Sequence, residues 1–304
     1  MEELCSTQEE ADTRIILHCL FAAQTMTDQD KIIVHSPDTD VFILLLSYAT
    51  DVGKPVVFET GSGSSRRLID ISYVASVLGE QCVKALPGFH AFTGCDSTSA
   101  FVRKGKKGPY KLMSASATFM DMFHKLGSDA DRVDSDVYQT LEHFVCAMYG
   151  HSKFRSSSLV RSLLFQSRYQ VALPKSLSAA SANGIDVSLL PPCPSTLWKH
   201  CLRANYQAFI WRHAHIAKPN LPPPDGCGWI KDMDGNLQVD WFDGDMMPQD
   251  MADIVETVNN VQTESDDTTH ATSGQDPSYL GTLEEDSEVE NIIDVIFEDD
   301  WDAM

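Results

Sequence analysis

The chain has 304 residues, 43% of them hydrophobic, and a formal net charge of −21 at pH 7. This hydrophobic content is ordinary for a globular protein, and no run approaches the ~18 apolar residues that predict a membrane span. The polar, acidic N-terminus MEELCSTQEEADTR excludes a secretory signal. We therefore expect an intracellular protein, nuclear or cytoplasmic, that is not secreted and has no membrane partner.

The charge is unevenly distributed along the chain. Lys231 is the last basic residue, and 22 Asp and Glu residues follow it, which leaves 22 acidic and 23 basic residues up to that point. A nearly neutral body therefore precedes a polyanionic tail, which can compete with a nucleic acid for the basic surface of the body. The eight cysteines lie singly, without a CxxC pair, which argues against a zinc ribbon and favours reduced, buried thiols.

The first predicted element is an amphipathic helix at residues 8–24. Ser6 or Thr7 is placed to cap it, and Glu9 or Glu10, three residues later, completes a capping box. Short runs rich in β-branched and apolar residues predict strands at 31–35, 55–59 and 66–71.

Two helices are predicted between and after these strands. The apolar run at 39–49 is too long for a comfortable strand and favours a buried helix. A second helix, at 72–86, is expected to end at Pro87-Gly88. Because strands alternate with helices, we predict an α/β fold with a parallel component in its sheet.

The rest of the chain is predicted to be mainly helical. Residues 111–170 have a helical pattern throughout, and 196–215 resume it after a Pro- and Ser-rich break. The stretch WIKDMDGNLQVDWF predicts a hairpin around Asp234-Gly235-Asn236. Four aromatic residues of the later helix could stack on bases, but their helical spacing favours core packing; they are Trp198, Tyr206, Phe209 and Trp211.

Three acidic motifs stand out in the first hundred residues. They supply Glu10 and Asp12 in EEAD, Asp38 and Asp40 in SPDTDV, and Asp96 in TGCDSTS. Each acid taken alone is explained equally well as a helix cap. The pair Asp38 and Asp40 is harder to explain in that way, since one helix start needs one cap and two adjacent carboxylates repel each other unless a cation lies between them. Carboxylate oxygens suit Mg²⁺ or Mn²⁺, and pairs of such ions support phosphodiester hydrolysis.

The order of these motifs resembles that of a known nuclease family. EEAD, SPDTDVF, LPGFHAFTGCDSTSAF and KGKKGPYKLM follow one another as the motifs do in PIN-like, flap-endonuclease (XPG-type) nucleases, and the resemblance extends over residues 1–150. The chain is also similar to mobile-element-associated animal proteins that add a RANYQA-IW segment, found here at 203–211.

The resemblance implies a division of the chain into three parts. Residues 1–171 would form a PIN-like, Rossmann-like parallel sheet core with helices. Residues 172–249 would form a helical extension with a small hairpin, and 250–304 a disordered acidic tail. Family members carry a strand with an aspartate ahead of the first motif, which begins here at residue 9. The resemblance therefore implies a domain that is incomplete at its N-terminus.

The resemblance also implies the site residues. Glu10, Asp12, Asp38, Asp40 and Asp96 would ligate one or two Mg²⁺ or Mn²⁺ ions, with Asp38 and Asp40 as the catalytic pair, and their carboxyl groups would converge within a few ångströms of one point. Two functions remain open at this stage. One is an endonuclease or exonuclease acting on DNA or RNA. The other is a non-catalytic nucleic-acid- or protein-binding scaffold derived from a mobile-element nuclease.

Two further segments are candidates for partner binding. The stretch RKGKKGPYK can be interpreted in two ways. It is either a clamp for the phosphate backbone of DNA or RNA, or an ordinary solvated loop. Its basic residues are Arg103, Lys104, Lys106, Lys107 and Lys111. In the tail, NIIDVIFEDDWD resembles a SUMO-interacting motif that would add Ile292, Ile293 and Val295 to a partner's sheet edge. An acidic tail with incidental aliphatic residues explains the same stretch.

Overall fold

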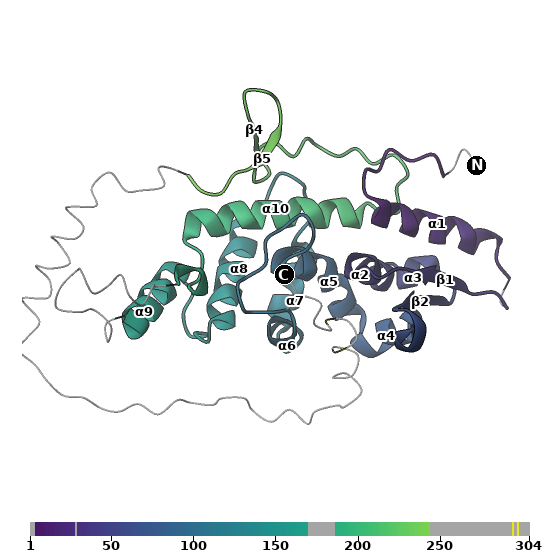
Figure 1. The fold of residues 1–304 in the computed structure, drawn as a ribbon, viewed down its shortest axis with the longest axis horizontal. Coiled ribbons are helices and arrows are strands. Elements are labelled where there is room, and N and C mark those ends of the chain that lie inside the picture. Colours follow the sequence, from purple (N-terminus) through teal and green to yellow (C-terminus); the bar gives the residue numbers. More distant parts are fainter. Residues whose placement is uncertain (1–3, 28, 170–185, 244–293, 295–296, 298–304) are drawn as a thin grey trace, which may run out of the picture.

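The computed structural model describes residues 4–27, 29–169 and 186–243, together with Asp294 and Phe297. These residues form a mixed α/β protein in which a small mixed sheet lies at one end of a largely helical body (Figure 1). Among them, no helix has the length and apolar character that crossing a membrane requires. The predicted disordered tail at 250–304 lies outside the described residues, apart from Asp294 and Phe297.

The sheet contains the three strands that the sequence predicts. They lie in the order β1 (Ile32–His35), β2 (Val56–Thr60) and β3 (Arg67–Asp70). The first two strands are parallel, with Ile32 opposite Val56, whereas β3 is antiparallel to β2. The predicted α/β class is thus confirmed in its coarse form, and the parallel component is a single strand pair.

The predicted buried helix is also confirmed. It is α2 (Thr39–Ser47), and every residue from Asp40 to Leu46 is buried. The helix begins directly beyond the carboxyl end of β1, and Asp38 is its N-cap, with Oδ1 accepting a hydrogen bond from the Asp40 N–H at 2.8 Å. A short helix, α3 (Ala49–Val52), and a 3₁₀ turn, η2 (Gly63–Ser65), lie between the following strands.

The capping box predicted for the first helix is wrong. Helix α1 (Ala11–Thr25) has Glu10 as its N-cap, and the Glu10 side chain makes no cap hydrogen bond. Its carboxylate is instead bound by two residues of α10 (Pro194–Arg212), nearly 200 positions later in the chain. A long-range interaction has replaced the local one that the sequence pattern favours.

The predicted helix end at Pro87-Gly88 is wrong as well. The region forms α4 (Ile71–Leu78) and α5 (Glu80–Thr93), and both Pro87 and Gly88 lie inside α5. A proline removes one helical hydrogen bond, but α5 is held by contacts with α2, α10 and α7 (Ala117–Lys125). A Cβ atom on Gly88 would lie 2.2 Å from the Phe123 carbonyl oxygen, so this glycine permits the close approach of α5 to α7.

The region predicted as helical from 111 to 170 is divided into separate helices. They are α6 (Lys107–Ser114), α7, α8 (Ser135–Met148) and α9 (Ser157–Tyr169). Gly127 and Gly150 follow α7 and α8 with φ values of 83° each, a conformation that glycine adopts without strain. At Gly127 a Cβ atom would lie 2.6 Å from the backbone of Ala208, so this turn also fits against α10.

Helix α10 runs along one side of the body, from the end near α8 to α1 (Figure 1). Its buried residues belong to the same hydrophobic core as those of α2, α5 and α8, so the predicted extension at 172–249 shares its core with the first part of the chain. The 3₁₀ turn η4 (Val187–Leu189) precedes α10, and the predicted hairpin, which follows α10, is confirmed as β4 (Trp229–Lys231) and β5 (Leu237–Val239). Arg203 of α10 anchors this hairpin by donating hydrogen bonds to the carbonyl oxygens of Gly228 and Asp240, at 3.0 and 2.9 Å.

Candidate functional site

The five predicted carboxylates lie in one region of the protein, and three of them, Glu10, Asp12 and Asp38, have raised pKa values. Burial, together with the charges of Asp38, Asp40, Glu10 and Asp96, raises the pKa of Asp12 to about 6. Burial also raises the pKa values of Glu10 and Asp38, and the neighbouring carboxylates add to both shifts. Helix α1, the β1–α2 junction and the turn after α5 therefore bring their acids into one negatively charged region.

Glu10 is held in place by α10. Its Oε1 accepts a hydrogen bond from Gln207 Nε2 at 2.8 Å, and its Oε2 accepts one from Trp211 Nε1 at 3.2 Å. Gln207 in turn accepts a hydrogen bond at 2.7 Å from the hydroxyl of Ser97, the residue after Asp96. Both Gln207 and Trp211 are buried, so the start of α1 and the Asp96 turn are connected through the interior of the protein.

Asp40 is held by a second buried network. Its Oδ1 lies 2.7 Å from His90 Nε2, and His90 Nδ1 lies 2.9 Å from Lys106 Nζ. Because an ammonium group only donates, Nδ1 accepts from Lys106 and Nε2 carries the proton donated to Asp40. Burial, reinforced by the charge of Lys106, lowers the pKa of His90 to about 4, so this imidazole is neutral at physiological pH.

Lys106 has an internal position that the sequence did not indicate. Besides His90 Nδ1, its ammonium group binds the His90 carbonyl oxygen and Thr93 Oγ1, each at 3.2 Å, and the carbonyl oxygen of Gly94. Burial lowers the pKa of Lys106 to about 7. This lysine therefore joins α6 to the end of α5, where the sequence predicted a contact with a phosphate backbone.

The turn that presents Asp96 is defined by its backbone. Gly94 has a φ of 117°, and a Cβ atom at this position would lie 2.8 Å from Ala100 Cα. Thr98 closes the turn, because its hydroxyl donates to the Ala91 carbonyl oxygen at 2.6 Å and its backbone pairs with Cys95. Asp96 is exposed on this turn, next to buried neighbours on both sides of the loop.

The donor chemistry of the region fits a hard divalent cation. All five predicted ligands offer carboxylate oxygens, which Mg²⁺ and Mn²⁺ prefer, and their mutual repulsion is the kind that a bound cation relieves. Within the described part of the chain, no group of three or more His, Cys, Asp or Glu side chains is arranged to hold an ion. Mg²⁺ usually takes one or two carboxylates and completes its coordination with water and phosphate oxygens, so a pair such as Asp38 and Asp40 matches its needs.

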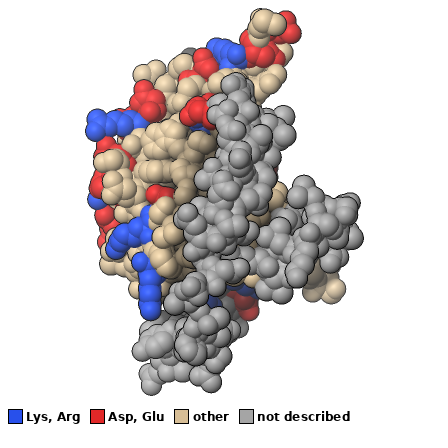
Figure 2. All heavy atoms as spheres, turned by 90° about the vertical axis from the view of Figure 1, so that its left-hand side faces the viewer, with Lys and Arg blue, Asp and Glu red and all other residues tan. Residues whose placement is uncertain are grey.

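The basic segment at 103–111 does not form one exposed loop, because α6 begins at Lys107. Lys104 donates to the Met148 carbonyl oxygen at 3.1 Å and lies 3.9 Å above the Tyr149 ring. Arg103 and Lys111 are exposed, one before α6 and one within it. On the face seen in Figure 2, Lys and Arg side chains are scattered among Asp and Glu. The five predicted nucleic-acid contacts therefore have different environments, and a shared role in binding a backbone stays a prediction.

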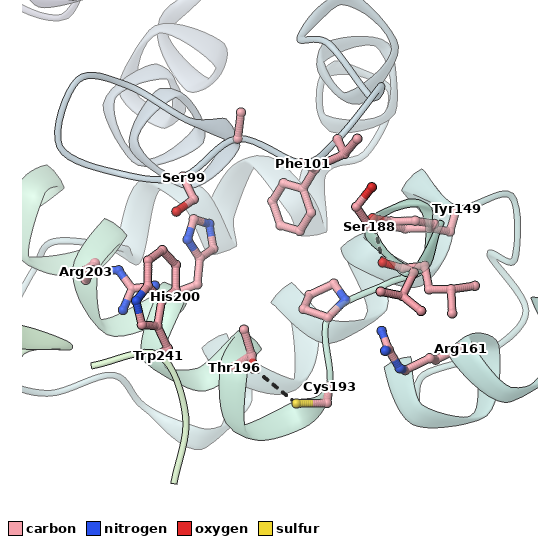
Figure 3. A pocket seen from close by; sticks show the side chains of 15 residues that line it. Ser99, Phe101, Tyr149, Arg161, Ser188, Cys193, Thr196, His200, Arg203 and Trp241 are labelled. Carbon is pink, nitrogen blue, oxygen red and sulfur yellow. Dashed lines mark hydrogen bonds between the residues drawn. The ribbon is translucent and has the colours of Figure 1, made fainter. Parts of the chain in front are cut away.

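A second feature, which the sequence did not indicate, is a cavity of about 300 Å³ beside the loop at 99–102 (Figure 3). Cys193, the N-cap of α10, lies at this cavity with its thiol 3.1 Å from Thr196 Oγ1. Burial raises the pKa of this thiol, but hydrogen bonds from Ser195 and Thr196 and the charge of Arg161 outweigh it and lower the pKa overall. His200 and Trp241 line the same cavity, which is mostly apolar.

Sequence reasoning did not single out His90 or Gln207, and it gave Lys106 and Trp211 other roles, as a nucleic-acid contact and a core aromatic residue. Gln207 and Trp211 are four residues apart and therefore share one face of a helix, and this spacing is the signal that could have associated them. No local pattern identifies His90 or Lys106, because their partners come from separate elements.

No family model, curated protein or solved structure matches this chain. The assignment of a function therefore depends on the acidic motifs and on the arrangement of the groups around them.

Proposed function

We propose that this protein is a divalent-metal-dependent nuclease that hydrolyses phosphodiesters of DNA or RNA, with a core of the PIN-like, flap-endonuclease type. The observation that carries the proposal is the gathering of carboxylates from three separate segments around Asp12, whose pKa is raised to about 6 by burial and by the charges of Asp38, Asp40, Glu10 and Asp96. An acidic cluster of this kind destabilises the folded protein in the absence of a cation, and such a cost is typical of a site kept for function.

In this proposal the chain's own residues position the ligands. Asp38 and Asp40 hold Mg²⁺ or Mn²⁺ at the carboxyl end of β1, and a bound ion of this kind activates water and stabilises charge on a phosphate. His90 fixes the orientation of Asp40, whose second oxygen is left for the ion. Gln207 and Trp211 fix Glu10 in the same way from α10. In known metalloproteins, residues that hydrogen-bond to the metal ligands orient these ligands and affect metal affinity.

A second candidate is a non-catalytic nucleic-acid- or protein-binding scaffold derived from a mobile-element nuclease. The observation that favours it is that several ligand oxygens already accept hydrogen bonds within the protein. Both oxygens of Glu10 are used in this way, as is one oxygen each of Asp38 and Asp40. In this interpretation the acids hold α1, α2 and α10 together, and metal binding is not needed.

The test measures metal binding and cleavage separately. The full chain is titrated with Mn²⁺ by calorimetry and incubated with labelled single-stranded and flap substrates of DNA and RNA in Mg²⁺ or Mn²⁺. We expect cleavage that Asp40→Asn abolishes and that Asp136→Asn, an exposed acid of α8, leaves unchanged. Metal binding without cleavage would contradict the nuclease and favour the scaffold. If the chain neither binds metal nor cleaves a substrate, the proposed metal site is contradicted as well.

A further inference from the structure

One residue of the acidic tail is buried in the body of the protein. Phe297 is only 6% exposed and belongs to the main hydrophobic core. Its ring lies edge-on to Phe89 of α5, with centroids 5.9 Å apart, and is tilted against Tyr110 of α6 at 5.5 Å. Phe89 and Tyr110 are themselves almost completely covered. A residue close to the end of the sequence therefore completes an aromatic cluster that begins at α5.

A second tail residue makes a polar contact beside this cluster. Asp294 Oδ1 lies 3.2 Å from Lys107 Nζ, and Lys107 is the first residue of α6. An acidic group is favourable near the N-terminus of a helix. The contacts with Tyr110 and Lys107 are thus both made to the first turn of α6, and Phe89 adds a contact from α5.

We propose that Phe89, Tyr110 and Lys107 form a binding surface for an acidic peptide with a single aromatic anchor, and that its occupant is the C-terminal segment of the same chain. We name this the tail-binding surface. The proposal does not depend on nuclease activity.

Phe297 supplies most of the affinity. Complete burial of a phenylalanine side chain corresponds to about a 10- to 100-fold gain in binding. The ion pair is exposed to solvent, with 36% of the Lys107 side chain and 63% of the Asp294 side chain accessible. Pairs of this kind change binding by less than about fivefold. We therefore expect the aromatic residue to determine occupancy and the acid to contribute little.

The tether between body and tail makes the interaction intramolecular. Fifty residues, 244–293, connect the described body to Asp294. Binding within one chain has an effective concentration that reaches the order of 1 mM, and at such a concentration even micromolar affinity keeps the surface occupied. While bound, the tail places a carboxylate on Lys107 and covers Phe89 and Tyr110. Its release would expose both aromatic residues and one of the basic residues predicted to contact nucleic acid.

The first experiment measures amide hydrogen exchange by mass spectrometry on the full chain. We expect protection around residue 297 and along α6 in the wild type, and its loss in Phe297→Ala. The matched control is Tyr279→Ala, which removes an aromatic residue from the same tail 18 positions earlier. Asp294→Asn should keep most of the protection. Equal exchange in wild type and Phe297→Ala would overturn the proposal.

The second experiment supplies the tail in trans. A labelled peptide of residues 288–304 is titrated into the full-length Phe297→Ala chain and into the wild type, with fluorescence anisotropy as the measurement. We expect at least about tenfold weaker binding to the wild type, because its own tail competes, and no binding of a peptide carrying the same Phe297→Ala change. Equal binding of the wild-type peptide to both chains would contradict an occupied surface. Protection that rises with protein concentration would assign the occupant to a second copy and overturn the intramolecular interaction.

Discussion

At the scale of single residues, the protein keeps several titratable groups in unusual states. His90 is neutral and holds one oxygen of Asp40, while Lys106 holds His90 from its other side. Removal of Asp40 or of Lys106 would leave one ring nitrogen of the buried His90 without its partner. An unpaired buried polar group costs about 1–3 kcal/mol, and more when charged. The orientation of Asp40 is therefore set by residues that sequence patterns do not associate with it.

Asp12 gives a prediction at this scale. Its pKa is raised to about 6 in the folded protein but is near 3.9 in an unfolded chain. The unfolded state therefore loses this proton first, and the folded state is penalised as pH rises from about 4 to 6. We expect Asp12→Asn to raise the free energy of unfolding by about 1 kcal/mol at pH 7.5 without divalent metal, a value reduced for solvent screening.

Urea unfolding at several pH values checks this expectation. The gain should shrink as the pH falls toward 4, where Asp12 becomes protonated in both states. Asp136→Asn is the control, because Asp136 is exposed on α8. A gain of the same size in the control, or one that does not depend on pH, would contradict the raised pKa of Asp12 that burial and the neighbouring carboxylates produce.

At the scale of elements, α10 connects parts of the protein that are far apart in sequence. Besides Gln207 and Trp211, its Asn205 accepts a hydrogen bond from the Gly127 N–H at 2.8 Å and donates to the carbonyl oxygens of Asp129 and Ala130. Arg203 holds the hairpin β4–β5. The polar residues of this helix are thus bonded to fixed parts of the body, which explains how a helix with many polar side chains can be buried.

Trp211→Phe tests the contact between α10 and α1. The change keeps an aromatic ring in the core and removes the donor to Glu10 Oε2, and the smaller ring also loses some buried packing. Hydrogen bonds to charged groups contribute about 1.5–3 kcal/mol, so we expect the free energy of unfolding to fall by about that amount at pH 7.5. Trp198→Phe, on the same helix, is the control for loss of an indole ring. Equal losses in both variants, measured in urea, would argue against a specific role of the donor.

Two helical glycines give a matched pair of predictions. Ala at Gly88 would place a Cβ atom 2.2 Å from the Phe123 carbonyl oxygen. A Cβ atom at Gly108 of α6 would have no other atom within 4 Å. We expect Gly88→Ala to separate α5 from α7 and to lower the free energy of unfolding by about 2 kcal/mol or more. Gly108→Ala should be neutral or stabilising by up to about 1 kcal/mol. Thermal unfolding distinguishes the two, and similar midpoints would contradict the close approach of the helices.

At the scale of the whole molecule, one hydrophobic core extends from α1 to α10. Two buried histidines, His90 and His200, make the stability of the protein depend on pH. His200 donates from Nε2 to the Phe92 carbonyl oxygen at 2.8 Å. Burial lowers the pKa of His200 to about 4, and that of His90 by a similar amount. Neutral histidines in the folded state contribute stability that is present above the unfolded pKa of about 6.5 and is lost between about 6.5 and 4.

The protein should therefore become less stable in mild acid. Each histidine contributes up to about 3 kcal/mol over this range. We expect His200→Gln, whose amide can still donate to Phe92, to weaken the decline of the free energy of unfolding between pH 6.5 and 4. His18→Gln is the control, because His18 is exposed on α1. An unchanged decline in His200→Gln, measured by urea unfolding, would show that this group does not titrate on unfolding.

The sequence by itself determined the elements that depend on neighbouring residues. Strands β1, β2 and β3, the buried helix α2 and the hairpin β4–β5 follow from apolar runs and turn residues that lie within a few positions of one another. The acidic motifs could likewise be recognised locally, although their metal-binding role stays a prediction.

Only the tertiary structure decided the features that depend on contacts between distant segments. Pro87 and Gly88 continue a helix that packs closely against α7 at Gly88. The Glu10 side chain makes no cap hydrogen bond, because Gln207 and Trp211 bind its carboxylate. Lys106 faces inward because His90 Nδ1 accepts a hydrogen bond from its ammonium group. In each case a partner far away in sequence outweighs the local preference, since a buried hydrogen bond or a packed backbone contributes more free energy than a cap or a propensity.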